Sequence, residues 1–240
     1  MTGIMMSLMN NVKSASGLTP STNGLMLHYD PNNLQSYPGS GSIIYDLSVN
    51  GINGTVTGSP PIIGNAFVLN GSSYIMSGDI TVAKGTNNSH TVEVWVKPSL
   101  TCAGWIDKGA ISLTSGYRST GLEFYSVGPF SICNTLLWNG QNTRMGGGNV
   151  TYNTWYQIVR TYNGTQAIAY VNKTAATATT FTWSPPQTWY IGFGASTDAS
   201  YFSTGAAFQG SYGVMRVYNR ALTSTEVIQN YNATKSKYGL

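Results

Sequence analysis

The segment TVEVWVKP, residues 91–98, carries the alternation that decides the fold. Its three valines fall on one face of an extended strand, and Glu93, Trp95 and Lys97 fall on the other. Pro98 lacks a backbone N–H and so ends the run. We predict a β-strand over 91–98 whose valine face lies in a hydrophobic core.

Similar runs occur along most of the chain. Residues 154–172 contain two of them, joined by Asn163-Gly164, a pair that supplies the positive φ angles of a two-residue type I′ turn. Shorter runs predict strands at 24–29, 66–70, 73–77, 121–126, 135–139, 188–194 and 212–219. Because no long amphipathic helical pattern accompanies them, the sequence predicts an all-β fold, an antiparallel double-sheet sandwich.

The C-terminal segment predicts one short capped helix. Thr223 and Glu226 have the spacing of a capping box, in which each side chain accepts a hydrogen bond from the backbone N–H of the other residue. The residues expected on the buried helical face are Val227, Ile228 and Tyr231. We expect the helix to cover an open end of the sandwich and the basic tail after it to stay solvated or to reach a neighbour.

Residues 1–23 differ from the rest of the chain. Apolar residues recur there at roughly helical spacing, and a Ser/Gly/Pro linker follows. These apolar positions are Ile4, Met5, Leu8, Met9 and Val12. The arm either packs on its own domain or docks on a neighbouring subunit, and we adopt the second reading as the working hypothesis. The predicted organisation is therefore an anchoring arm over 1–23 and one domain over 24–240.

The charge pattern argues against two classes of partner. Only 8% of the residues are charged, and the net charge of +4 comes from scattered bases, so no basic stripe for nucleic acid is visible. No apolar run is long enough to span a membrane.

Cys102 and Cys133 are the two cysteines, and their spacing leaves both buried thiols and a disulfide open.

Most of the chain after residue 23 resembles the concanavalin A-like, laminin-G-like jelly-roll family. The matching segments, in the family's order, are 24–56, 66–78, 91–98, 155–164 with 169–172, and 217–235. The resemblance implies a jelly roll of two packed antiparallel sheets with six or seven strands each. It does not imply one function, because lectins, glucanases, adhesion modules and structural parts share this fold. The NYNATK ending (230–235) looks most similar to versions in structural proteins of tailed bacteriophages, and a bacterial surface protein would also fit.

Acidic residues are sparse for the hydrolytic chemistry that the family supports. A retaining glycosidase needs two carboxylates about 5–5.5 Å apart. The acids closest in sequence, Asp79 with Glu93 and Glu93 with Asp107, are each fourteen positions apart. Folding could still bring Glu93 and Glu123 together, so hydrolysis ranks third among the functions considered. We predict that the protein is not an enzyme.

Neither the histidines nor the glycine run predicts another chemistry. His28 and His90 stand apart from any nucleophile motif, which favours surface or sheet-edge positions over a role as general base. The MGGGN run (145–149) lacks the strand–loop–helix context of a phosphate loop and is predicted to be a flexible turn.

Calcium is an alternative that comes from the resemblance, since laminin-G-like modules often bind it through an Asp and backbone carbonyls. The oxygen donors available are Asp30, Asp46 and Asn50. Such side chains also build turns, which is the interpretation we favour. The family often has an acidic residue two or three positions before the arginine of the penultimate strand, whereas this chain has Gly213-Val214-Met215 before Arg216. No cofactor is therefore predicted.

Sugar binding requires exposed aromatic rings near amides. The candidates are Trp183, Trp189, Tyr201 and Trp138, and two prolines hold the first two tryptophans near a turn. Trp95 and Trp155 lie in predicted strands and are expected to form a core pair.

Two hypotheses follow for the function. The first is a non-enzymatic virion structural protein of a tailed phage, a capsid decoration or a tail or fibre component assembled in the host cytoplasm. Its partners would be other virion proteins, and it would be a trimer by analogy with phage decoration and fibre proteins. The second is a carbohydrate-binding adhesion module for host-surface polysaccharide, and the two hypotheses are compatible.

Overall fold

The computed structural model describes residues 17–81, 85–99, 108–113, 121–127, 130–138, 142–180, 190–194 and 208–240. Its strands are β1 (Leu25–Tyr29), β2 (Ile43–Ile44), β3 (Gly54–Thr57), β4 (Ile62–Ile63), β5 (Ala66–Asn70), β6 (Tyr74–Met76), β7 (His90–Pro98), β8 (Lys108–Leu113), β9 (Gly121–Val127), β10 (Phe130–Trp138), β11 (Asn142–Val150), β12 (Tyr156–Tyr162), β13 (Gln166–Val171), β14 (Thr174–Ala175), β15 (Thr179–Thr180), β16 (Ile191–Phe193) and β17 (Gln209–Tyr218). Its helices are η2 (Thr86–Asn88), α1 (Ser224–Thr234) and η4 (Lys235–Tyr238).

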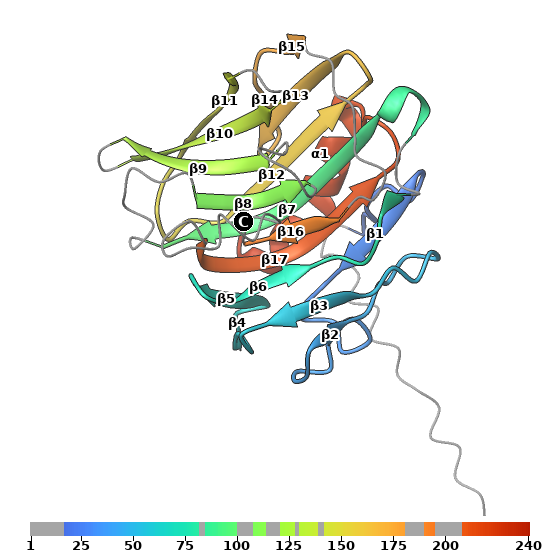
Figure 1. Cartoon of the computed structure of the whole chain (residues 1–240), viewed down its shortest axis with the longest axis vertical. Coiled ribbons are helices and arrows are strands. Elements are labelled where there is room, and N and C mark those ends of the chain that lie inside the picture. The colour runs from blue at the N-terminus through green and yellow to red at the C-terminus, as the bar shows by residue number, and fades with distance from the viewer. Residues whose placement is uncertain are drawn as a thin grey trace, which may run out of the picture.

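The strands form two antiparallel sheets that face each other (Figure 1). The nine-stranded sheet has the order β14-β13-β12-β7-β17-β5-β4, with β1 paired to β17 and β15 paired to β13. The eight-stranded sheet has the order β11-β10-β9-β8-β16-β6-β3-β2. The predicted all-β jelly-roll sandwich is therefore confirmed. Each sheet has more strands than the resemblance implied, because the count includes four short strands of two residues each, β2, β4, β14 and β15.

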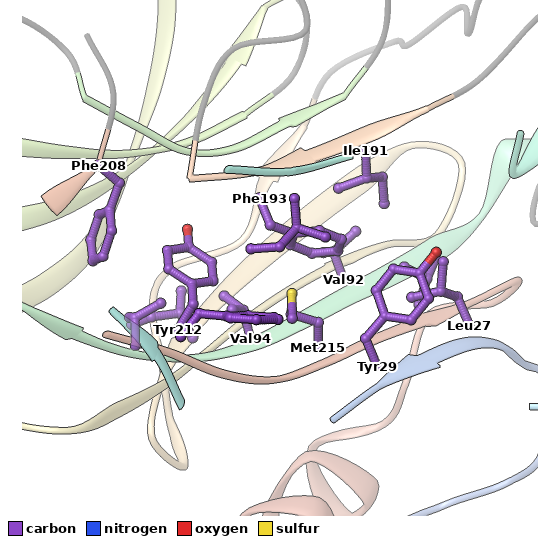
Figure 2. Close-up of a cluster of buried hydrophobic side chains, with 14 of the residues drawn as sticks. Leu27, Tyr29, Val92, Val94, Ile191, Phe193, Phe208, Tyr212 and Met215 are labelled. Carbon is purple, nitrogen blue, oxygen red and sulfur yellow. The ribbon is translucent and has the colours of Figure 1, made fainter. Parts of the chain in front are cut away.

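The core lies between the sheets. The three valines of β7, predicted to be buried, are at most 2% exposed. Figure 2 shows Val92 and Val94 among Phe193 of the opposite sheet and Met215 and Tyr212 of β17. Burying one such side chain stabilises the fold by about 1.5–3 kcal/mol. The valine face of 91–98 thus lies in the core between the two layers, as predicted.

The hairpin between β12 and β13 differs from the predicted type I′ turn. Asn163 and Gln166 face each other, so the turn residues are Gly164 and Thr165, and of these only Gly164 has a positive φ, +103°. Asn163 instead accepts hydrogen bonds at Oδ1 from the backbone N–H of Thr165 (3.0 Å) and Gln166 (2.8 Å). This Asx arrangement shifts the turn by one residue.

The MGGGN run is not a turn. It lies inside β11, where Gly146 pairs with Asn134 of β10 and Met145 pairs with Thr135. The prediction was wrong because the low strand propensity of glycine is overridden when a long neighbouring strand supplies the pairing.

Helix α1 begins with the predicted capping box. Thr223 Oγ1 accepts from Glu226 N, and the Glu226 carboxylate accepts from Thr223 N. The buried face differs from the prediction, because Ile228 is 38% exposed whereas Asn230 and Thr234 are buried. Asn230 faces inward because it bonds to a buried polar cluster beneath the helix. None of the described helices is long and apolar enough to cross a membrane.

The C-terminal tail is packed rather than solvated, contrary to the prediction. Residues 235–238 form the short helix η4, Tyr238 is buried, and Lys237 bonds the Asp30 carboxylate. Helices α1 and η4 thereby cover the nine-stranded sheet on the face away from the eight-stranded sheet.

The described end of the N-terminal segment is attached to this same helix. Ser21 N donates to Asn230 Oδ1 (2.8 Å), and Tyr218 Oη donates to Ser21 O (3.1 Å). Gln229 Nε2 also donates to Thr19 O (2.9 Å). Residues 19–23 therefore belong to the folded domain, and the predicted arm positions from Ile4 to Val12 lie outside the described residues.

Candidate functional site

Most of the predicted sugar-binding aromatics cannot be placed. Trp183, Trp189 and Tyr201 lie outside the described residues, as does Cys102. Trp138 is the last residue of β10, where its backbone pairs with Asn142. The candidate site below is therefore built from aromatic side chains that the structure describes.

The three candidate calcium ligands are engaged with the protein itself. The two oxygens of Asp46 accept from the backbone N–H of His28 (2.8 Å), Ser48 (2.9 Å) and Ile52 (3.0 Å). Asp30 accepts from Asn32 N (3.1 Å) and bonds Lys237, and Asn50 Nδ2 donates to Met26 O (3.1 Å). These contacts are the turn-building role that we favoured. Within the described ranges, no three His, Cys, Asp or Glu side chains gather as a metal site.

Glu93 lies in a buried polar cluster beneath helix α1. Its carboxylate accepts from Arg216 Nη1 (2.8 Å), Gln157 Nε2 (2.9 Å) and Asn230 Nδ2 (2.7 Å). Asn230 Nδ2 also donates to Tyr218 Oη (2.9 Å). Every member is at most 3% exposed. The cluster satisfies the buried charge of Glu93 and fixes which face of α1 turns inward.

The cluster assigns Glu93 a structural role. Burial lowers the pKa of the Arg216 guanidinium, but the adjacent Glu93 carboxylate offsets this together with Tyr218, Asp30 and Tyr238. The pKa of Arg216 is therefore raised. Glu93 points to the helix-covered face of the nine-stranded sheet, whereas Glu123 belongs to β9 of the opposite sheet. The possibility that folding pairs these two acids for hydrolysis thus loses its geometric basis.

The two histidines differ in position. His28 lies on β1, which pairs with β17 alone among the described strands, and so has the predicted sheet-edge position. His90 begins the central strand β7 and is fully buried, so a surface or edge position was wrong for it. Its Nδ1 contacts Asn88 O (2.8 Å) and its Nε2 contacts Arg160 Nη2. Burial and the Arg160 charge both lower the pKa of His90, which favours the neutral imidazole.

Four aromatic rings contact one another on the helix-covered face of the nine-stranded sheet. The Trp95 ring lies 4.8 Å from that of Tyr238 and 5.6 Å from that of Tyr231, with both pairs stacked. Trp155 continues the row, 4.2 Å from Tyr238. Trp95 and Tyr238 are buried, whereas Trp155 and Tyr231 are half-buried. Two accessible rings thus rest on two inaccessible ones.

Gly213 makes room for this row. A Cβ at residue 213 would lie 2.0 Å from Tyr238 Oη and 2.5 Å from its Cζ. The Tyr238 hydroxyl lies close to the backbone here and accepts a hydrogen bond from Val214 N (2.8 Å). Glycine at position 213 therefore leaves room for the Tyr238 ring.

Three lysines lie over the accessible rings. Lys97 Nζ is 5.7 Å from the centre of the Trp155 ring, and the Nζ atoms of Lys173 and Lys235 are 5.8 Å and 5.6 Å from the Tyr231 ring. These are cation–π distances. We call Trp155, Tyr231 and these three lysines the lysine–aromatic surface, and it is our candidate functional site.

This surface was not predicted from the sequence. Trp155 was expected to form a core pair with Trp95, and only Trp95 is fully buried. The three lysines come from β7, the turn after β13 and η4, so their meeting depends on long-range pairing that no local pattern reveals. The one available signal was the density of aromatic and lysine residues over 231–238.

Several solved structures share the fold. The fourth domain of AbnA, a GH43 extracellular arabinanase from Geobacillus stearothermophilus solved with arabinotriose, superposes with a TM-score of 0.61 at 17% identity, covering 86% of this chain and 98% of that one. The sialidase of Trypanosoma rangeli gives 0.65 at 14% identity, covering 90% of this chain and 33% of its own. The binding domain of Paraclostridial Mosquitocidal Protein 1 gives 0.61 at 14%, covering 88% and 52%.

Among curated proteins, none matches the chain in sequence. The family model of the concanavalin A-like lectin/glucanases superfamily matches residues 69–228, more than half of the chain. With the two facing sheets described above, this match shows that the chain belongs to the concanavalin A-like lectin/glucanases superfamily.

Proposed function

We propose that this chain is a non-enzymatic carbohydrate-binding protein that uses the lysine–aromatic surface as its binding site. The observation that carries the proposal is the pair of half-buried rings, Trp155 and Tyr231, each held against a buried ring. Aromatic rings offer a large apolar face for the C–H groups of a sugar, and a fixed ring loses little entropy when a ligand binds. The related arabinanase domain, solved with arabinotriose, makes a carbohydrate a reasonable ligand class.

The absence of enzymatic activity is part of the proposal. It is supported by Glu93, whose carboxylate is held by three buried donors and is directed away from the other sheet. A nucleophile or general acid must instead reach the substrate.

Trp155→Ala should reduce affinity for a bound polysaccharide at least tenfold, which corresponds to about 1.4 kcal/mol. The change removes an accessible ring, so the fold should keep its thermal midpoint within a few degrees. A panel of bacterial polysaccharides in affinity gel electrophoresis, followed by titration calorimetry, measures this. Tyr190→Ala is the matched control, because Tyr190 is also exposed (37%) and adjoins β16 of the other sheet. Unchanged binding by Trp155→Ala, or no binding by the native protein, would reject the site.

We further propose that the domain is carried by a tailed-phage virion as a capsid decoration or a tail or fibre component, with other virion proteins as partners and trimeric assembly. The similarity of the NYNATK ending and the apolar spacing of residues 4–12 support this role. The hydrogen bonds of Thr19 and Ser21 to α1 give residues 1–16 a fixed point of departure from the domain.

Deletion of residues 1–16 should abolish incorporation into particles while residues 17–240 stay folded. The deletion ends before Thr19 because residues 19–23 bond to α1. Particles assembled with tagged full-length or shortened protein are compared by sedimentation and immunoblotting. A shortened protein that is incorporated as well as the full chain would contradict the anchoring role.

A further inference from the structure

The lysine–aromatic surface carries three positive charges and no ion pair that the described residues provide. Lys97, Lys173 and Lys235 each lie within 6 Å of a ring centre, and no acidic group bonds them in the described part of the chain. In contrast, the neighbouring Lys237 is paired with Asp30.

The five acids whose side chains the structure describes are all committed elsewhere. Glu93 bonds Arg216, Glu226 bonds Arg220, and Asp30 bonds Lys237. Asp46 accepts backbone hydrogen bonds in its own loop, and Asp79 accepts from Thr81 N (2.8 Å). None of these five acids forms an ion pair with the three ammonium groups.

We infer that the ligand of the lysine–aromatic surface is an acidic glycan, a polymer whose sugar rings carry carboxylates. This inference rests on the proposed function. Sugar rings would pack on Trp155 and Tyr231, and carboxylates would bond the lysines. Lys97 lies at the Trp155 end of the aromatic row, and Lys173 and Lys235 lie at the Tyr231 end. Charges at both ends of an apolar row match a polymer with repeating charges.

The arrangement favours a glycan over a nucleic acid. Single-strand binders combine aromatic stacking with a basic groove that follows the phosphate backbone over several nucleotides. Here three lysines surround two rings whose inner faces already contact Trp95 and Tyr238. Three lysines around two rings are too few for a basic groove that follows several phosphates.

The test compares two forms of one polymer. Polygalacturonate and its fully methyl-esterified form share a backbone and differ in charge. By titration calorimetry we expect the acidic form to bind about tenfold more tightly at 50 mM salt, since three exposed ion pairs each contribute modestly. The advantage should shrink as added salt screens the charges.

Three variants sharpen the test. The triple change Lys97→Gln, Lys173→Gln and Lys235→Gln should remove the preference for the acidic form, so that the ratio of the two affinities falls to about one. The corresponding arginine triple keeps the charges and should retain the preference. Lys237→Gln is the matched control, since its ammonium is held by Asp30 and it should leave the preference unchanged. Thermal unfolding verifies that each variant is folded.

The outcomes separate the inference from the proposed function. Equal affinity for both polymers, or a preference that survives the glutamine triple, would overturn the acidic-glycan inference and leave carbohydrate binding standing. Absence of binding to every acidic and neutral polysaccharide would overturn both. Tighter binding to single-stranded oligothymidylate than to polygalacturonate, lost in the glutamine triple, would assign the surface to nucleic acid and overturn the inference.

Discussion

Glu93→Gln should lower the free energy of unfolding by about 3–5 kcal/mol, because it leaves the Arg216 guanidinium buried without its counter-charge. Arg216 and Glu93 have side chains only 4% and 0% exposed, and their atoms are 2.8 Å apart. The amide can still bond Gln157 or Asn230, so the loss comes mainly from the charge. Urea unfolding followed by tryptophan fluorescence and by circular dichroism measures it.

Two comparisons isolate that cause. Glu226→Gln changes the same chemical group at the Arg220 pair, whose side chains are 25% and 21% exposed, and should cost no more than about 1 kcal/mol. The double change Glu93→Met with Arg216→Met removes both charges and should be less damaging than Glu93→Gln alone, because replacing a buried pair by apolar residues is often neutral. A Glu93→Gln protein as stable as the native one would show that the buried pair does not hold α1.

The partly exposed Glu226–Arg220 pair at the start of α1 shifts the pKa of Glu226 but contributes little to stability. A side-chain hydrogen bond from Arg220 lowers the pKa of Glu226 to about 2. A carboxylate with a lowered pKa stabilises the fold above its unfolded pKa, and this contribution is lost as the pH falls toward 2. Because the pair is partly exposed, solvent screening keeps the contribution small. The Glu226–Arg220 pair is therefore expected to contribute less to stability than the buried pair at Glu93.

Long alternating runs and local caps could be predicted from the sequence. The strand at 91–98, the run at 66–70 and the Thr223 capping box all appear as expected, since each depends on neighbouring residues. The two-residue strands could not be predicted, because two residues carry no periodicity. Strand β11 was missed for a related reason, since its glycines pair only because β10 lies beside them.

The candidate site was harder to predict than the fold. Helical spacing alone placed Ile228 on the buried face, whereas the polar partners of Asn230 decide which face turns inward. Lys97 and Lys235 stand 138 positions apart in sequence (235 − 97), and they reach one surface because η4 folds back across β7. Sites assembled in this way depend on long-range packing, which a single sequence does not encode in any local pattern.

Trp95→Ala should cost about 3–5 kcal/mol of unfolding free energy and should also abolish glycan binding. Trp95 is fully buried, and its ring stacks on both Tyr238 and Tyr231. Its indole Nε1 is buried without a hydrogen-bond partner among the described residues. The loss is therefore one of packing, since the substitution removes no hydrogen bond and leaves a cavity beneath η4.

A comparison with Trp155→Ala distinguishes the role of the buried Trp95 ring from that of an accessible ring in the lysine–aromatic surface. Trp155→Ala should impair binding with little loss of stability, whereas Trp95→Ala should impair both, because the rings above it lose their base. Trp95→Phe keeps an aromatic ring and should recover most of the binding and part of the stability. Urea unfolding and calorimetric titration of the same preparations measure the two effects. If Trp95→Ala is strongly destabilised but binds polysaccharide with native affinity, the aromatic row does not position the ligand, and the binding site must lie elsewhere on the sandwich.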